Sequence, residues 1–322
     1  MVSGTHPRKR RGSPHGLGAV PPDAASVLIE GPWHHRLVSA NGARFHVAEL
    51  GDGPMVLLMH GFPQFWYAWR HQMTAIAEAG WRAVAMDLRG YGASDKPPRG
   101  YDTYTSTADA AKIIRSLGED DAIVIGQGLG GFIAWSMPAL QPEVVRAVGS
   151  LSMPHPRVMR RASLLDRRQR RASRYLLELQ RPFGPERDMT KDHGYVRDIL
   201  CAWSSPFGEW PTPEDVARYG DAMALPFVAH SAAEHYRWFG RSQIRQDGPL
   251  FNRRIRGPIT QPVLQLQGTE DRCVLADATE GSDAYVAGPY RYELVDGAGH
   301  FLTEEAPARV SASIVDWLDT VD

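Results

Sequence analysis

Short apolar runs recur along the chain, and residues typical of turns separate them. Two runs, 35–40 and 44–50, flank Asn41-Gly42, which is a strong hairpin signal. The run Met55–Met59 is apolar throughout, as expected of a strand that is covered on both faces. Similar runs follow at 81–88, 121–125, 144–150, 262–267 and 291–295. The pattern therefore predicts eight strands.

Helix-length segments separate most of these runs, and alternating strands and helices predict a mainly parallel sheet with right-handed crossovers. One interval, 154–257, has no comparable strand, although apolar residues recur there at helical spacing. The simplest explanation is a helical cap inserted after the sixth strand. The expected organisation is a core formed by 31–153 and 258–322 with a cap at 154–257.

The remaining segment, 1–30, is predicted to be a disordered tail. It carries the basic cluster Arg8-Lys9-Arg10-Arg11 among Pro, Gly and Ser. No apolar segment follows this cluster, so it does not have the pattern of a secretory signal.

Bulk composition excludes several classes of function. A formal net charge of −1 over 322 residues argues against nucleic acid as the main partner. Two cysteines, Cys201 and Cys273, make no disulfide framework and fit a reducing cytoplasm. No apolar run approaches 18 residues, so no transmembrane helix is expected. Spaced His or Cys ligands and an extended phosphate-binding loop are also missing, so neither a metal nor a cofactor is expected.

Candidate chemistry lies where strands end, because ligands of such sheets bind beyond the carboxyl ends of the strands. The segment Gly126-Gln127-Gly128-Leu129-Gly130 follows a strand and opens a helix. This is the outline of a nucleophile elbow, G-x-S-x-G, but its central position, Gly128, carries no side chain. Residues 125–134 contain no Ser, Cys, Thr, Asp or Glu, so a slipped motif cannot supply the nucleophile. The pattern also departs from the dinucleotide fingerprint G-x-G-x-x-G and lies on the fifth strand instead of the first.

Three further motifs follow strands. His60-Gly61-Phe62-Pro63 supplies a glycine turn that could aim a backbone N–H at developing negative charge, although an ordinary Gly-Pro turn has the same composition. The loop 87–95, rich in glycine and charge, is interpreted as a salt-bridged scaffold. Asp271 and His300 follow the last two strands, in the chain order nucleophile, acid, base. We therefore expect them to form a hydrogen-bonded pair.

Together these motifs resemble the epoxide hydrolase and haloalkane dehalogenase branch of the α/β-hydrolase superfamily, over about residues 33–320. The likeness to epoxide hydrolases is closer, because His-Gly-Phe-Pro followed by Trp-Tyr-x-Trp-Arg is typical of them. The resemblance implies the α/β-hydrolase fold, with an eight-stranded sheet and a cap after strand 6. It also implies an acid, Asp271, a base, His300, oxyanion donors on the amides of Phe62 and Leu129, and two cap tyrosines, Tyr175 and Tyr236.

For both tyrosines a packing role stays open. Substrate contacts are expected from His60, Trp66 and Gln127. In the family an elbow aspartate attacks the epoxide, and Gly128 removes that step. Three functions remain: hydrolysis of a small apolar substrate by water that His300 and Asp271 activate, binding of a small apolar ligand under the cap, and an interaction scaffold.

One segment of the expected cap is strongly basic. Residues 157–174 contain eight arginines, opposed within the segment only by Asp166. The pattern is typical of a solvated helix face, and the alternative is a surface for an acidic partner.

Overall fold

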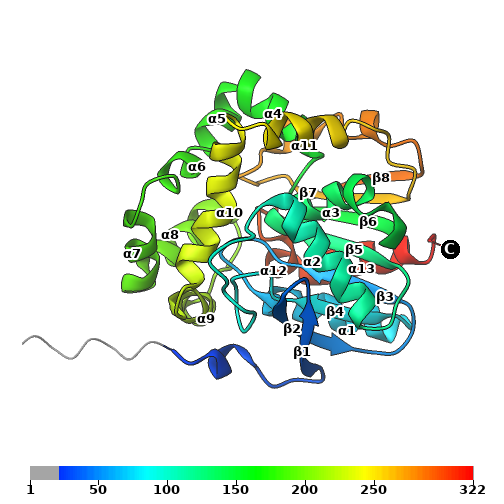
Figure 1. Ribbon diagram of the computed structural model, residues 1–322, viewed down its shortest axis with the longest axis horizontal. Coiled ribbons are helices and arrows are strands. Elements are labelled where there is room, and N and C mark those ends of the chain that lie inside the picture. Colours follow the sequence, from blue (N-terminus) through cyan, green and yellow to red (C-terminus); the bar gives the residue numbers. More distant parts are fainter. Residues whose placement is uncertain (1–21, 322) are drawn as a thin grey trace, which may run out of the picture.

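The computed structural model describes residues 22–321, and an eight-stranded sheet runs through its centre (Figure 1). The strand order is β1-β2-β4-β3-β5-β6-β7-β8, with β2 antiparallel to both of its neighbours and the other pairs parallel. The strands are β1 His34–Ala40, β2 Ala43–Leu50, β3 Met55–Met59, β4 Arg82–Met86, β5 Ala122–Gln127, β6 Val145–Leu151, β7 Val263–Gly268 and β8 Tyr290–Val295. The mostly parallel eight-stranded sheet predicted from the sequence is confirmed.

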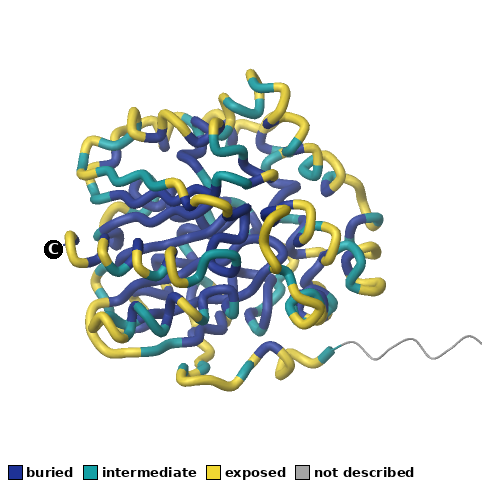
Figure 2. The backbone as a smooth tube through the Cα atoms, turned by 180° about the vertical axis from the view of Figure 1, so that it is seen from behind, coloured by how far each residue is buried: buried dark blue, intermediate teal, exposed yellow. Residues whose placement is uncertain are grey.

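Burial explains the apolar patterning of the strands. Every residue of β3, β5 and β7 is buried, because helices cover both faces of the inner strands. Figure 2 shows this buried backbone through the middle of the molecule, with exposed segments around it. The edge strand β1 is mostly exposed and joins β2 through Asn41-Gly42, where both residues have positive φ (45° and 75°).

The helices of the core pack in pairs, α1 with α13 and α2 with α3. A Cβ on Gly126 would lie 2.1 Å from the carbonyl of Gly130, and one on Gly130 would lie 2.1 Å from the carbonyl oxygen of Met59. Glycine at both positions therefore lets α3 begin directly against the sheet. The core helices are α1 Arg70–Glu78, α2 Thr103–Ser116, α3 Leu129–Leu140, α12 Leu302–Glu305 and α13 Pro307–Leu318.

Eight helices lie between β6 and β7 and form the cap, above and to the left of the sheet in Figure 1. They are α4 Pro156–Leu165, α5 Arg167–Ala172, α6 Tyr175–Glu178, α7 Gly184–Lys191, α8 Gly194–Trp203, α9 Pro213–Ala224, α10 Val228–Ser242 and α11 Asp247–Arg254. Short 3-10 turns complete the fold: Ala24–Val27, Trp66–Trp69, Pro142–Val144, Ala276–Thr279 and Asp283–Tyr285. Each helix in the described range is too short or too polar to cross a membrane.

The described start of the chain packs on the core. Val27 is buried, and its carbonyl accepts a hydrogen bond of 2.8 Å from Trp66 Nε1. The disordered tail predicted for 1–30 is therefore wrong for residues 22–30, where a buried valine and an indole partner offset the ordering entropy. The rest of that prediction, including the basic cluster at 8–11, lies outside the described residues.

Candidate active site

The elbow turn places Gly128 between β5 and α3 with φ 54° and ψ −114°. This left-handed backbone is strained for residues with a side chain and relaxed for glycine. A Cβ on residue 128 would lie 3.3 Å from Nε2 of His300, the closest atom to it. The geometry is that of an elbow aimed at a histidine, without the side chain that the elbow normally carries.

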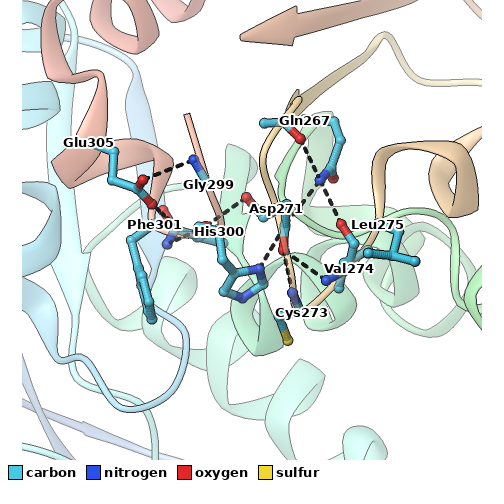
Figure 3. Close-up of polar contacts among 12 residues, drawn as sticks. Gln267, Asp271, Cys273, Val274, Leu275, Gly299, His300, Phe301 and Glu305 are labelled. Carbon is cyan, nitrogen blue, oxygen red and sulfur yellow. Dashed lines mark hydrogen bonds and ion pairs between the residues drawn. The ribbon is translucent and has the colours of Figure 1, made fainter. Parts of the chain in front are cut away.

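His300 and Asp271 form a buried pair after the two last strands. His300 Nδ1 lies 2.9 Å from Asp271 Oδ2, and both residues are at most 4% exposed (Figure 3). Oδ1 of Asp271 accepts two hydrogen bonds of 2.8 Å, from the amides of Cys273 and Val274. These amides hold the carboxylate as an acceptor, so it orients His300 with Nδ1 protonated and Nε2 free to take a proton.

The backbone of His300 is held from three sides. Its N–H donates to Trp203 O at 3.0 Å, and its carbonyl accepts from Ser152 Oγ at 2.7 Å and from Gln127 Nε2 at 3.3 Å. Glu305 accepts from the amides of the two flanking residues, at 2.9 Å and 2.8 Å. The position of the imidazole is thus fixed by residues of the cap, the elbow and α12.

The residues expected to supply the oxyanion donors both lie near the elbow. Phe62 follows β3, Leu129 is the first residue of α3, and both line the cavity beside Gly128. Within residues 22–321 neither of the two amides donates a hydrogen bond to another group. Both N–H groups are therefore available as donors, which is the property that an oxyanion hole requires.

A cavity of about 440 Å³ opens above the elbow, between the strand ends and the cap. Its wall is mostly apolar and aromatic, and Arg160 on α4 is its one permanently charged side chain among the described residues. Arg160 and Leu164 are exposed, whereas Gly128 and His300 are buried, so the cavity runs inward from α4. The apolar wall includes Phe62, Leu129, Phe132, Met153, Met159, Trp203, Trp238, Phe239 and Phe251.

Both cap tyrosines line this cavity. Their ring centroids lie 5.8 Å apart, Tyr175 coming from α6 and Tyr236 from α10. The Tyr236 hydroxyl has no hydrogen-bond partner in the part of the chain that the structure describes, and the Tyr175 hydroxyl has the Cys273 thiol as its polar neighbour. Burial raises the pKa of both phenols well above the usual value, so both hydroxyls stay protonated and able to donate at neutral pH.

Three residues expected to contact the substrate do not line the cavity. His60 is buried, with Nδ1 at 2.9 Å from Gly61 O and Nε2 accepting from the amide of Leu88. Trp66 packs under the described start of the chain. Gln127 lies behind the elbow, where its Oε1 accepts from Thr303. Each polar group is already committed to the protein, so these residues position the site instead of binding a ligand.

The loop 87–95 is a scaffold, but its charged residues pair with other elements and not with one another. Asp87 does not pair with Arg89. It lies 2.8 Å from His46 Nδ1 and accepts from the amide of Trp66, while Arg89 binds Asp109 on α2. Asp87 and Arg89 are two positions apart, yet each binds a residue that is distant in sequence.

Several cavity residues were missed by sequence reasoning, among them Phe132, Trp203, Phe239 and Cys273. The aromatic residues belong to α3 and the cap, where helical spacing predicts apolar positions but not which of them face a cavity. Cys273 lies two residues after Asp271, and that proximity was the one available signal. The described residues contain no cluster of three or more His, Cys, Asp or Glu side chains suited to a metal ion.

Comparisons with known proteins agree with this geometry. Residues 54–307 match the family described as alpha/beta hydrolase fold. The AB hydrolase superfamily protein YfhM of Bacillus subtilis is 32% identical over 288 residues, covering 88% of this chain and 97% of the relative. Epoxide hydrolase A of Mycobacterium tuberculosis is 30% identical over 313 residues, covering 88% and 96%.

Among solved structures, an epoxide hydrolase from an endophytic Streptomyces superposes with a TM-score of 0.79 at 30% identity, covering 90% of this chain and 96% of that one. Sequence, fold and the His300–Asp271 geometry lead to one assignment. This chain belongs to the α/β-hydrolase superfamily, in its epoxide hydrolase-like branch.

Proposed function

We propose that this protein hydrolyses a small apolar substrate, an epoxide or an ester, by direct attack of water and without a covalent enzyme intermediate. The observation that carries the proposal is the relation between Gly128 and His300. A side chain at residue 128 would begin 3.3 Å from His300 Nε2, and both residues line the cavity. A water molecule in that space would lie within reach of the base.

For an epoxide, His300 Nε2 takes a proton from water as the water oxygen bonds to a ring carbon. The bond from that carbon to the ring oxygen breaks, and the oxygen takes a proton from Tyr236 or Tyr175. The imidazolium proton then returns to the phenolate through water, and the product is a diol. Asp271 stabilises the imidazolium while it carries the proton.

For an ester, the developing negative charge lies on the carbonyl oxygen, and the amides of Phe62 and Leu129 are the matching donors. An apolar substrate is favoured because the deep part of the cavity is lined by aromatic and aliphatic side chains. A cytoplasmic location fits the two cysteines, both of which are unpaired.

The second candidate is a homologue without catalytic activity that keeps the cavity as a ligand site. The observation that favours it is the missing nucleophile at Gly128, because a general base alone replaces only part of a covalent mechanism. This candidate predicts binding of small apolar epoxides without turnover.

A labelled-water experiment tests the first candidate. The full chain, in molar excess over styrene oxide, is incubated in H₂¹⁸O, and the diol of the first turnover is analysed by mass spectrometry. We expect label in the diol and no mass added to the protein. An enzyme ester would instead pass an unlabelled enzyme oxygen to the first diol and would contradict the proposal.

Two variants complete the test. His300→Ala should lower kcat/KM for hydrolysis by about 10²- to 10⁴-fold, the usual contribution of a general base. Gln243→Ala, at the outer part of the cavity, is the matched control. Undiminished turnover in His300→Ala would exclude the mechanism, and binding without any wild-type turnover would favour the ligand-binding candidate.

A further inference from the structure

A second hollow lies between the cap and the core and shares no residue with the cavity. Its volume is about 780 Å³, and its walls come from α5, the end of α8 and the loop 269–277. We call it the arginine groove, because Arg168, Arg171 and Arg272 line it. Two of these arginines belong to the basic segment 157–174, which the proposed hydrolysis does not use.

The charges in the arginine groove do not balance. Arg168 forms an ion pair with Asp277, the exposed acid on the same wall. Asp271 reaches the groove as well, but its carboxylate is committed to His300, Gln267 and two backbone amides. The guanidinium groups of Arg171 and Arg272 have no hydrogen-bond or ion-pair partner within residues 22–321. Two guanidinium groups therefore line the groove without an ion-pair partner, and its three arginines and two aspartates leave a net charge of +1.

The two free arginines come from different parts of the molecule, and a buried glutamine fixes their relative position. Gln169 on α5 donates to Cys273 O at 2.9 Å and accepts from the amide of Leu275 at 2.9 Å. Both contacts lie in the loop that carries Arg272. Gln169 thus joins α5 to this loop through contacts that involve neither Arg171 nor Arg272.

We propose that the arginine groove binds a small phosphate monoester. A phosphate monoester carries about −1.5 to −2 charges at pH 7 and several acceptor oxygens, which suits a groove of net positive charge with two unpaired guanidinium groups. One guanidinium group can donate two parallel hydrogen bonds to phosphate oxygens. Arg171 and Arg272 can therefore bind one phosphate from two sides. The small apolar side chains of Ala172, Ala202, Leu275 and Ala276 leave a wall for a short organic group.

A concave site of this size favours a small molecule over the acidic partner that the sequence leaves as the alternative to a solvated helix face. Bound phosphate would connect the cap helix α5 with the loop that holds Asp271 and would therefore oppose separation of cap and core. The inference does not rest on hydrolysis, because the groove is separate from the cavity.

Calorimetric titration with two matched ligands tests the proposal. Propyl phosphate and propyl sulfate have the same organic group, but the phosphate approaches two negative charges at pH 7.5 and the sulfate carries one. At constant ionic strength we expect the full chain to bind propyl phosphate at least threefold more tightly. Equal affinity for both ligands, or no binding of propyl phosphate at millimolar concentration, would overturn the proposal.

Four arginines supply variants and controls. Arg171→Gln and Arg272→Gln should each weaken propyl phosphate binding by roughly threefold to tenfold, as expected for partly exposed charge-assisted pairs. The control combines Arg161→Gln and Arg174→Gln, two exposed arginines of the same basic segment outside the groove, and should leave the affinity within about twofold.

These variants also distinguish a specific groove from a basic surface. An equal loss of affinity in the Arg161/Arg174 control would show general attraction to positive charge and would reject the groove. An acidic peptide that binds through Arg171 and Arg272 while propyl phosphate does not would also reject a small-molecule site. Hydrolysis of styrene oxide by the groove variants should equal that of the wild type, so the two proposals can fail separately.

Discussion

At residue scale, position 128 joins two properties that usually conflict. Its φ of 54° suits glycine, and the family chemistry needs a side chain there. The glycine therefore relaxes the backbone and leaves the elbow without a side chain. Ser136, the nearest hydroxyl further along α3, is fully buried and donates to Phe132 O, so it does not replace the missing group.

Gly128→Asp should lower the free energy of unfolding by about 1–3 kcal/mol, because the side chain adopts a left-handed backbone and its Cβ lies 3.3 Å from His300 Nε2. Urea unfolding measures the loss. The same variant should form an ester with styrene oxide that mass spectrometry maps to the elbow peptide. Gly257→Asp, at a glycine with open space around it, is the control and should change stability little. An unchanged urea midpoint for Gly128→Asp would contradict the strained elbow.

Tyr175→Phe and Tyr236→Phe should separate hydrogen bonding from packing. Each change keeps the ring contacts and removes the hydroxyl of a residue that lines the cavity. If the tyrosines donate to the epoxide oxygen, each variant should lose about tenfold or more in kcat with nearly unchanged stability. Steady-state kinetics and thermal unfolding of the same samples decide. Wild-type kinetics in both variants would assign the tyrosines to packing.

Residue contacts can be predicted from the sequence where the order and register of neighbouring strands determine them. Asp271 and His300 follow neighbouring parallel strands whose last residues, Gly268 and Val295, are in register, so their proximity follows from strand order. Gln127 was predicted to face a substrate and faces away. Side-chain direction in a turn depends on its φ and ψ, and apolar patterning carries no information about them.

At element scale, α10 connects the cap to the loop after β4. His235 is buried on α10, with Nε2 at 3.0 Å from Arg89 O. Burial, together with the nearby charges of His60 and Arg89, lowers the pKa of His235 to about 4, although its hydrogen bond to Arg89 opposes the shift. His235 is therefore neutral in the folded protein at neutral pH.

Acid should therefore weaken this connection. The pKa of His235 is about 4 in the folded protein and 6.5 in the unfolded chain. The stability present above pH 6.5 is therefore lost as the pH falls from 6.5 toward 4, because the unfolded chain takes up the proton first. This pKa difference of about 2.5 corresponds to a loss of about 3 kcal/mol in the free energy of unfolding. His235→Gln should flatten the decline of urea stability between pH 6.5 and pH 4, whereas His34→Gln, an exposed control, should not. Parallel declines for wild type and His235→Gln would contradict the assignment.

The elements themselves were largely predictable, but the details of the cap were not. Strand starts and ends fall within a few residues of the apolar runs, because Gly, Asn and Asp mark the turns. In the cap, Phe183, His193 and Phe227 adopt positive φ immediately before helices. Such residues do not indicate a left-handed conformation, so the division of 154–257 into eight helices is set by tertiary packing.

At the scale of the whole molecule, one buried polar cluster joins cap and core. Tyr219 on α9 donates to Glu304 on α12, which also binds Arg70 on α1 through hydrogen bonds of 2.7 Å and 2.8 Å. Desolvation raises the pKa of Glu304, although the Arg70 partner opposes this shift. The cluster therefore links α9 of the cap to α1 and α12 of the core.

Tyr219→Phe should loosen the cap more than the sheet. Loss of one hydrogen bond to a buried charged group costs about 1.5–3 kcal/mol. Hydrogen exchange should consequently rise across α7–α10, with smaller changes in β3 and β5. Tyr290→Phe removes a hydrogen bond to Gln265 within the sheet and serves as the control. Equal protection of the cap in Tyr219→Phe and wild type would show that the cap is held by its apolar contacts.

Gly128 also bears on how this site can change over generations. In the genetic code a glycine triplet that ends in a pyrimidine differs from an aspartate triplet by its middle base alone. The relaxed backbone at φ 54° means that glycine arises there with a gain in folding stability, while the acid–base pair stays assembled next to it. Where the codon of residue 128 ends in a pyrimidine, a carboxylate at this elbow is therefore one base change away, and selection on stability acts against that change.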